Sequence, residues 1–139
     1  MIGDKWSLLI LRAALYGLRR FEDFQAELGI PRTVLSDRLA KLVANGLLTK
    51  RNYHEPGSRA RPEYWLTEKG QALRLPFIAM TEWGDRWIGG GRPPPMILKE
   101  RGSGERLHVG MVKESGAEVL TADIEAEFPK RGRPQARRV

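Results

Sequence analysis

The sequence predicts an α+β fold, in which a mainly helical domain with one two-stranded hairpin precedes a small β-rich extension. Apolar residues recur at helical spacing in three successive segments near the N-terminus. Two short segments rich in aromatic and other β-forming residues follow them. The stretch Gly89 to Pro95 then combines three glycines with three prolines, which interrupts regular structure and predicts a linker.

The first predicted helix runs from Lys5 to Tyr16, capped by Asp4 and ended by Gly17. Its apolar positions recur at i, i+3, i+4 and i+7. They are Trp6, Leu9, Ile10 and Ala13.

Two further helices are predicted on either side of a tight turn. The second spans 21–28, with Gly29 as its stop. The third opens at Pro31, whose fixed φ suits a first helical turn, and ends near Asn45, with Gly46 beyond it. Its inward-facing residues are predicted to be Leu35, Leu39 and Leu42.

A β-hairpin follows, with strands over 47–54 and 62–67 and a turn over 55–61 that carries two arginines. A last long helix is predicted from Thr67 through Trp87, with Pro76 inside it as a kink.

This order of elements is that of a winged helix-turn-helix, in which the third helix enters the DNA major groove and the hairpin forms a wing. The exposed side of the third helix is rich in small polar and charged side chains that can approach base edges or phosphates. Its predicted DNA-contacting residues are Arg32, Thr33, Ser36, Asp37, Arg38 and Lys41. Those of the wing are Lys50, Arg51, Arg59 and Arg61. A solvated amphipathic face and a solubility loop are the alternative interpretations of these two sets.

Charge and composition favour a polyanionic partner. The 139 residues contain 24 Lys and Arg against 17 Asp and Glu, a net charge of +7. There is no cysteine, which excludes disulfides, thiolate catalysis and thiol redox sensing within this sequence. The sequence has only two histidines, and it contains no pattern typical of a catalytic nucleophile, a metal site or a phosphate-binding loop. These observations argue against an enzyme and against a bound cofactor. No apolar run approaches the length of a membrane span, so we expect a cytoplasmic, nucleoid-associated protein.

The segment Gly3 to Arg12 (GDKWSLLILR) resembles the G-x-K-W-[ST]-x-x-I-L opening of the HxlR-type family of bacterial transcriptional regulators. The resemblance covers about residues 2–88. Further residues in register with that family are Arg20 and Phe21 with Phe24, Leu35 to Leu39, Leu42, Asn45 to Leu47, Glu63 to Gly70 and Glu82 to Gly84.

The resemblance implies a homodimer that binds double-stranded DNA at a palindromic operator and acts as a repressor, with a small-molecule effector of unknown identity. It also implies a dimer interface built from the helices at both ends of the domain. The residues it places there are Trp6, Ile10, Phe77, Trp83 and Trp87.

Three departures from the family pattern stand out. Family members carry a segment before the first motif, which here starts at Gly3, so the sequence suggests a truncated or misassigned start. Pro31 replaces a common serine cap, and the wing is about two residues longer than usual between Tyr53 and Glu63.

The chain is thus expected to divide into a DNA-binding domain over 1–88, a linker over 89–95, a small β module over 96–128 and a basic tail over 129–139. The module resembles the zinc ribbon that some relatives carry, but its ligand positions lack cysteine and histidine, so no metal is expected. Those positions are Ser103, Glu105, Lys113 and Gly116.

The tail resembles the AT-hook core, which lies extended in the minor groove of A·T tracts. A basic tail without base preference is the alternative. The residues concerned are Arg131, Gly132, Arg133 and Pro134.

The sequence therefore predicts a sequence-specific DNA-binding transcriptional regulator. The alternative is a winged-helix module for protein interaction or RNA binding, with only nonspecific affinity for nucleic acid. Binding that depends on base sequence favours the first hypothesis, and salt-sensitive binding that ignores sequence favours the second.

Overall fold

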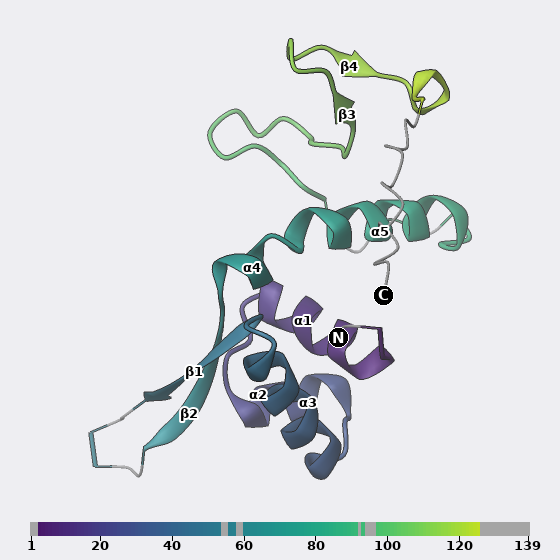
Figure 1. Ribbon diagram of the computed structural model, residues 1–139. Coiled ribbons are helices and arrows are strands. Elements are labelled where there is room, and N and C mark those ends of the chain that lie inside the picture. Colours follow the sequence, from purple (N-terminus) through teal and green to yellow (C-terminus); the bar gives the residue numbers. More distant parts are fainter. Residues whose placement is uncertain (1–2, 54–55, 58–59, 92, 94–96, 126–139) are drawn as a thin grey trace, which may run out of the picture. The chain divides into compact units, whose positions relative to one another are not determined.

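The computed structural model describes residues 3–53, 56–57, 60–91, 93 and 97–125. The chain forms two compact units, Met1–Met96 and Ile97–Val139. In the first unit, three helices pack together and an antiparallel hairpin extends away from them (Figure 1). The fold is the predicted α+β winged helix-turn-helix.

Helix α1 (Lys5–Leu15) begins where predicted, because the Asp4 side chain accepts a hydrogen bond from the backbone N–H of Ser7. It ends one residue earlier than predicted, at Leu15, and Gly17 adopts a φ of 108°.

Helices α2 (Phe21–Leu28) and α3 (Arg32–Ala44) form the helix-turn-helix. Gly29 ends α2 with a left-handed φ of 58°, as predicted. Pro31 precedes α3 and supplies no side-chain cap. The prediction that one face of α3 points inward is confirmed, since Leu35, Leu39 and Leu42 are all fully buried. The core around them also contains Ile10, Leu11, Ala13, Ala14, Phe24, Ile30, Leu47, Leu48 and Tyr64.

Strands β1 (Leu48–Tyr53) and β2 (Arg61–Leu66) pair antiparallel with Leu48 opposite Leu66 and Tyr53 opposite Arg61. Because side chains alternate between the two faces of a strand, Tyr64 points to the core while Glu63 and Trp65 lie on the opposite face. An isolated bridge between Arg20 and Glu63 adds the segment before α2 to the β2 edge.

The prediction of one long helix kinked at Pro76 is wrong. The structure has a short helix α4 (Glu68–Gln71) and a separate helix α5 (Arg74–Trp87). Pro76 cannot donate to the carbonyl four residues earlier, which kinks or breaks a helix upstream of it, and here the helix breaks. The proline then lies in the first turn of α5, where its missing N–H costs nothing.

The second unit is built from short pairings. Lys99 and Arg106 form an isolated bridge, and β3 (Met111–Val112) pairs with β4 (Glu118–Val119). A single 3₁₀ turn, η1 (Thr121–Asp123), follows. Among the described residues of the predicted β module, regular pairing is thus limited to the bridge between Lys99 and Arg106 and the two-residue strands β3 and β4.

Within 97–125, no residue of this second unit is buried, so these residues form no hydrophobic core of their own. No group of three or more His, Cys, Asp or Glu side chains is placed to hold a metal ion among the residues that the structure describes. No helix in the described part of the chain is long and apolar enough to cross a membrane.

Candidate nucleic-acid interface

Helix α3 exposes a polar face opposite its three buried leucines. Five of the six residues predicted from this helix to contact DNA have exposed side chains. The sixth, Arg38, is half-buried and is held by groups of the protein. The exposed five are Arg32, Thr33, Ser36, Asp37 and Lys41.

The start of this face is formed by Arg32, whose guanidinium lies over the ring of Phe21, 4.9 Å from its centroid. A guanidinium stacked on an aromatic ring is restricted in direction but keeps its N–H edge available. Arg32 is therefore oriented by α2 while remaining able to donate to a base or phosphate.

The middle of the face carries a row of alternating charges. Lys41 Nζ donates to Asp37 Oδ2 at 2.9 Å, and Arg38 also contacts Asp37. The hydrogen bond from the Lys41 ammonium lowers the pKa of the Asp37 carboxyl. Asp37 is therefore an anion at neutral pH on the exposed surface of α3.

The row of charges on α3 continues to Asp4, the N-cap residue of α1. Arg38 Nε donates to Asp4 Oδ1 at 2.9 Å, and Asp4 also accepts from the backbone N–H of Ser7 at 3.0 Å and its hydroxyl at 2.6 Å. The Ser7 hydrogen bonds, with a smaller contribution from Arg38, lower the pKa of Asp4 to about 2. Asp4 thus joins the N-terminus of α1 to the middle of α3.

The wing exposes the predicted cations Lys50, Arg51 and Arg61. These cations lie on both faces of the hairpin. Lys50 is opposite the core-facing Tyr64, whereas Arg51 is opposite Glu63 on the outer face. The guanidinium of Arg51 is 5.4 Å from the centroid of the Trp65 ring. Arg59 lies outside the described residues, as does the tail with Arg131, Gly132, Arg133 and Pro134.

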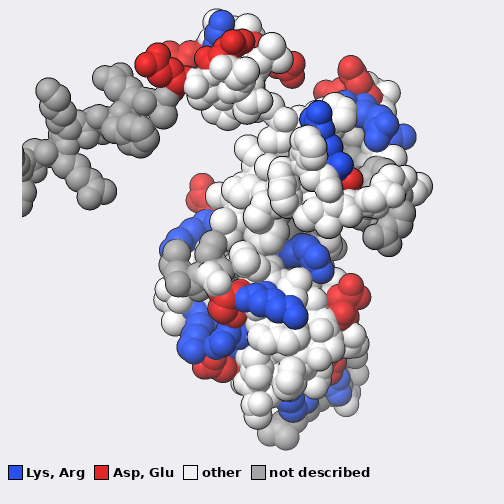
Figure 2. Space-filling view, turned by 90° about the vertical axis from the view of Figure 1, so that its right-hand side faces the viewer, with Lys and Arg blue, Asp and Glu red and all other residues white. Residues whose placement is uncertain are grey.

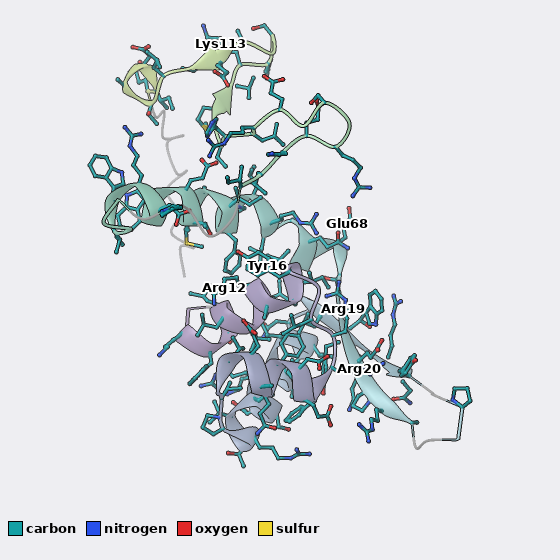
Figure 3. All side chains as sticks on the ribbon, turned by 180° about the vertical axis from the view of Figure 1, so that it is seen from behind. Arg12, Tyr16, Arg19, Arg20, Glu68 and Lys113 are labelled. Carbon is teal, nitrogen blue, oxygen red and sulfur yellow. The ribbon has the colours of Figure 1, made fainter. Side chains whose placement is uncertain are left out.

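Two cations on the outer face were not among the predicted site residues. The guanidiniums of Arg19 and Arg20 lie 4.8 Å from the ring centroids of Trp65 and Tyr53 respectively, beside the hairpin base (Figure 3). Arg20 also pairs with Glu63. Arg20 is in register with the family pattern, but no local pattern indicates what either arginine contacts, because their partners come from strands more than 30 residues later.

The basic residues are spread among acidic ones. Figure 2 shows one side of the molecule, where Lys and Arg are interspersed with Asp, Glu and uncharged residues. Among the described residues on this side, the charges therefore form no large field of one sign.

The residues that the family resemblance placed at a dimer interface differ in exposure. Ile10 is 0% exposed and belongs to the core of the monomer, so its side chain offers no surface to a partner in this structure. Trp6 and Phe77 are half-buried against that core. Trp83 and Trp87 are 59% and 68% exposed.

A comparison with protein families matches residues 1–91 to the HxlR-like helix-turn-helix model. The chain belongs to this family. A relative in Mycobacterium tuberculosis, the uncharacterised HTH-type transcriptional regulator Rv3095, is 37% identical over 122 residues. That alignment covers 88% of this chain and 76% of the relative, so the similarity reaches beyond the HxlR domain.

Solved structures of similar proteins agree with this family assignment. PA1607, assigned as a transcription factor, has a TM-score of 0.77 and 32% identity, covering 92% of this chain and 89% of that one. PA1374 from Pseudomonas aeruginosa has a TM-score of 0.65 and 32% identity, with coverage of 95% and 89%. The reduced form of the transcriptional regulator YodB from Bacillus subtilis has a TM-score of 0.54 and 30% identity, with coverage of 65% and 87%.

The HxlR domain, the relatives and the helix-turn-helix geometry together make the protein a DNA-binding transcriptional regulator and not an enzyme.

Proposed function

We propose that the protein is a repressor that binds a palindromic operator as a homodimer. Helix α3 would read the major groove, and the wing would contact the adjacent minor groove or phosphates. The observation that carries this proposal is the exposed polar face of α3, opposite its buried leucines and in the same compact unit as an exposed basic hairpin. The proposal locates the protein at the nucleoid, in the cytoplasm.

The contacts divide by role. Arg32 has the donor geometry for guanine O6 and N7, and Asp37 can accept from the amine of cytosine. Thr33 and Ser36 can bond a base edge or a phosphate, while Lys41, Lys50 and the wing arginines suit phosphates.

The dimer is supported by α5. None of its 14 residues is buried, although apolar side chains follow one another along it. Met80, Trp83 and Trp87 recur at i, i+3 and i+7, which places them along one side of the helix. An exposed apolar row of this size requires a cover in solution, and a second copy of the chain supplies one. The exposed large apolar residues in and beside α5 are Leu75, Met80, Trp83, Trp87 and Ile88.

The test is fluorescence anisotropy of the purified chain with its own upstream intergenic DNA and with a scrambled duplex of equal composition, each at several salt concentrations. We expect a preference for the native duplex of about a thousandfold or more. Equal binding with equal salt slopes would contradict the proposal and favour the protein-interaction or RNA-binding alternative. Transcription in vitro from the same duplex tests the sign of regulation, since a repressor lowers the amount of transcript.

A further inference from the structure

Arg38 lies in the middle of the proposed recognition helix, yet its side chain is directed to α1. Its Nε atom donates to Asp4 at 2.9 Å, it also contacts Asp37, and the side chain is only 25% exposed. The guanidinium charge is therefore matched by two carboxylates of the protein. A phosphate contact would have to compete with both of them.

Asp4 is itself held in place. It caps α1 through the backbone N–H of Ser7 and accepts from the hydroxyl of the same, fully buried serine. Three donors on one carboxylate fix its position relative to the α1 axis. Asp4 is thus a rigid acceptor for a side chain that arrives from another helix.

The buried leucines of α3 fix which face of the helix points to the core. Apolar contacts have no preferred bond direction, so a directional contact adds to the definition of the helix rotation. Its start is preceded by Pro31 and has no side-chain cap. A charge-assisted hydrogen bond between planar groups has a strict geometry, so the Asp4–Arg38 pair adds a directional constraint on the rotation of α3 to the packing of its leucines.

We propose that Arg38 is a positioning residue for base recognition: held by Asp4, it sets the rotation of α3 and thereby the sequence preference, without contacting DNA. The inference rests on the proposed function, in which α3 reads the major groove. Base-edge hydrogen bonds tolerate misplacement of only about 0.5 Å, so a small rotation of α3 weakens the native duplex selectively.

The decisive variant is Arg38→Lys. Lysine keeps the charge and serves as well as arginine in a simple phosphate contact, but it lacks the planar fork that holds Asp4 while contacting Asp37. We expect the ratio of native to scrambled affinity to fall about tenfold with no change in salt slope. An unchanged ratio would overturn the inference.

A double-mutant cycle tests the partner. Asp4→Ser keeps a good N-cap for α1 but removes the acceptor of Arg38, and Arg38→Met keeps an unbranched apolar stem. Each single variant is expected to lower the affinity ratio about tenfold, and the double variant to be no worse than either. Additive losses, or a salt slope reduced by about one in Arg38→Met, would show that Arg38 contacts phosphate and overturn the inference.

Lys50→Met is the matched control, at an exposed lysine of the wing that is proposed to contact phosphate. It should reduce the salt slope by about one and leave the affinity ratio unchanged. Thermal unfolding of each variant confirms that it is folded at the assay temperature. A wild-type chain without duplex preference would overturn the proposed function, whereas wild-type preference that survives in Arg38→Lys and Asp4→Ser would overturn this inference alone.

Discussion

At the scale of single residues, Asp37 is the unusual member of the proposed interface, because it brings a negative charge to a surface that should meet phosphates. Its partners Lys41 and Arg38 compensate it within the protein. In the proposed complex, this carboxylate would disfavour every DNA sequence that offers no amine to it, and would thus add to specificity by repulsion as well as attraction.

Replacing Asp37 by asparagine tests this role. Asp37→Asn should tighten binding to the scrambled duplex by about fivefold, since a repulsive charge is lost and Lys41 is released. The preference for the native duplex should fall by about tenfold. Anisotropy titrations with both duplexes measure the two effects. Glu22→Gln, an exposed charge change on α2, is the control, and an equal gain on both duplexes in Asp37→Asn would contradict a role in specificity.

The lowered pKa of Asp4 predicts that the free energy of unfolding falls in acid. Its pKa of about 2 in the folded protein lies below the ordinary value of 3.8 for an aspartic acid, so its contribution to folding is complete above about pH 4 and is lost as pH falls toward 2. Urea unfolding of wild type and Asp4→Ser across this range gives the difference in the free energy of unfolding. That difference should be constant between pH 5 and 7 and shrink toward pH 2. A constant difference down to pH 2 would show that Asp4 is not linked to folding in this way.

At the scale of elements, the sequence predicts what depends on local pattern. Helices α1 to α3 and the wing hairpin lie within one or two residues of their predicted bounds, because caps, glycine stops and apolar spacing are local signals. The direction of Arg38 was not predictable from spacing, since its acceptor lies 34 residues away. Stacking of Arg19 on Trp65 and the burial of Ile10 likewise depend on tertiary packing.

The break between α4 and α5 also has a tertiary component. Gly70 is buried at the end of the wing, where an added Cβ would lie 2.2 Å from the carbonyl oxygen of Leu47. Thr67 caps α4 through the Gly70 N–H and donates to the carbonyl oxygen of Gly46 at 2.6 Å, which holds α4 against the end of α3. The short helix α4 is therefore fixed to the domain by close backbone packing.

Gly70→Ala should consequently destabilise the domain by about 1–3 kcal/mol, because the backbone at Leu47 must move to admit a methyl group. Gly84→Ala in α5 is a matched control, since its added Cβ would meet no atom within 4 Å. There the change should stabilise by about 0.5–1 kcal/mol, as expected for glycine in a helix interior. Urea denaturation compares the two variants. Equal effects would mean that the close approach at Gly70 is not a constraint on the fold.

At the scale of the whole molecule, the core of the first unit is complete around α1, α2, α3 and the wing, and α5 adds no buried residue to it. The exposed Trp83 and Trp87 of this helix support the dimer proposed above. In such a dimer, two copies of α3 would read the two half-sites of a palindromic operator about one symmetry axis.

Trp83→Arg tests the assembly. A guanidinium in the apolar row of α5 would lack a partner in a dimer core, so sedimentation should change from dimer to monomer at concentrations where the wild type is dimeric. Binding to the full operator should weaken by at least about a hundredfold while binding to a single half-site is retained. The variant loses only the gain in affinity that comes from joining two recognition helices in one dimer. Leu120→Arg adds the same charge at a 75% exposed residue of the second unit and should leave both measurements unchanged. A monomeric wild type, or a variant that remains dimeric, would exclude α5 as the interface and would require another contact to bring two recognition helices together.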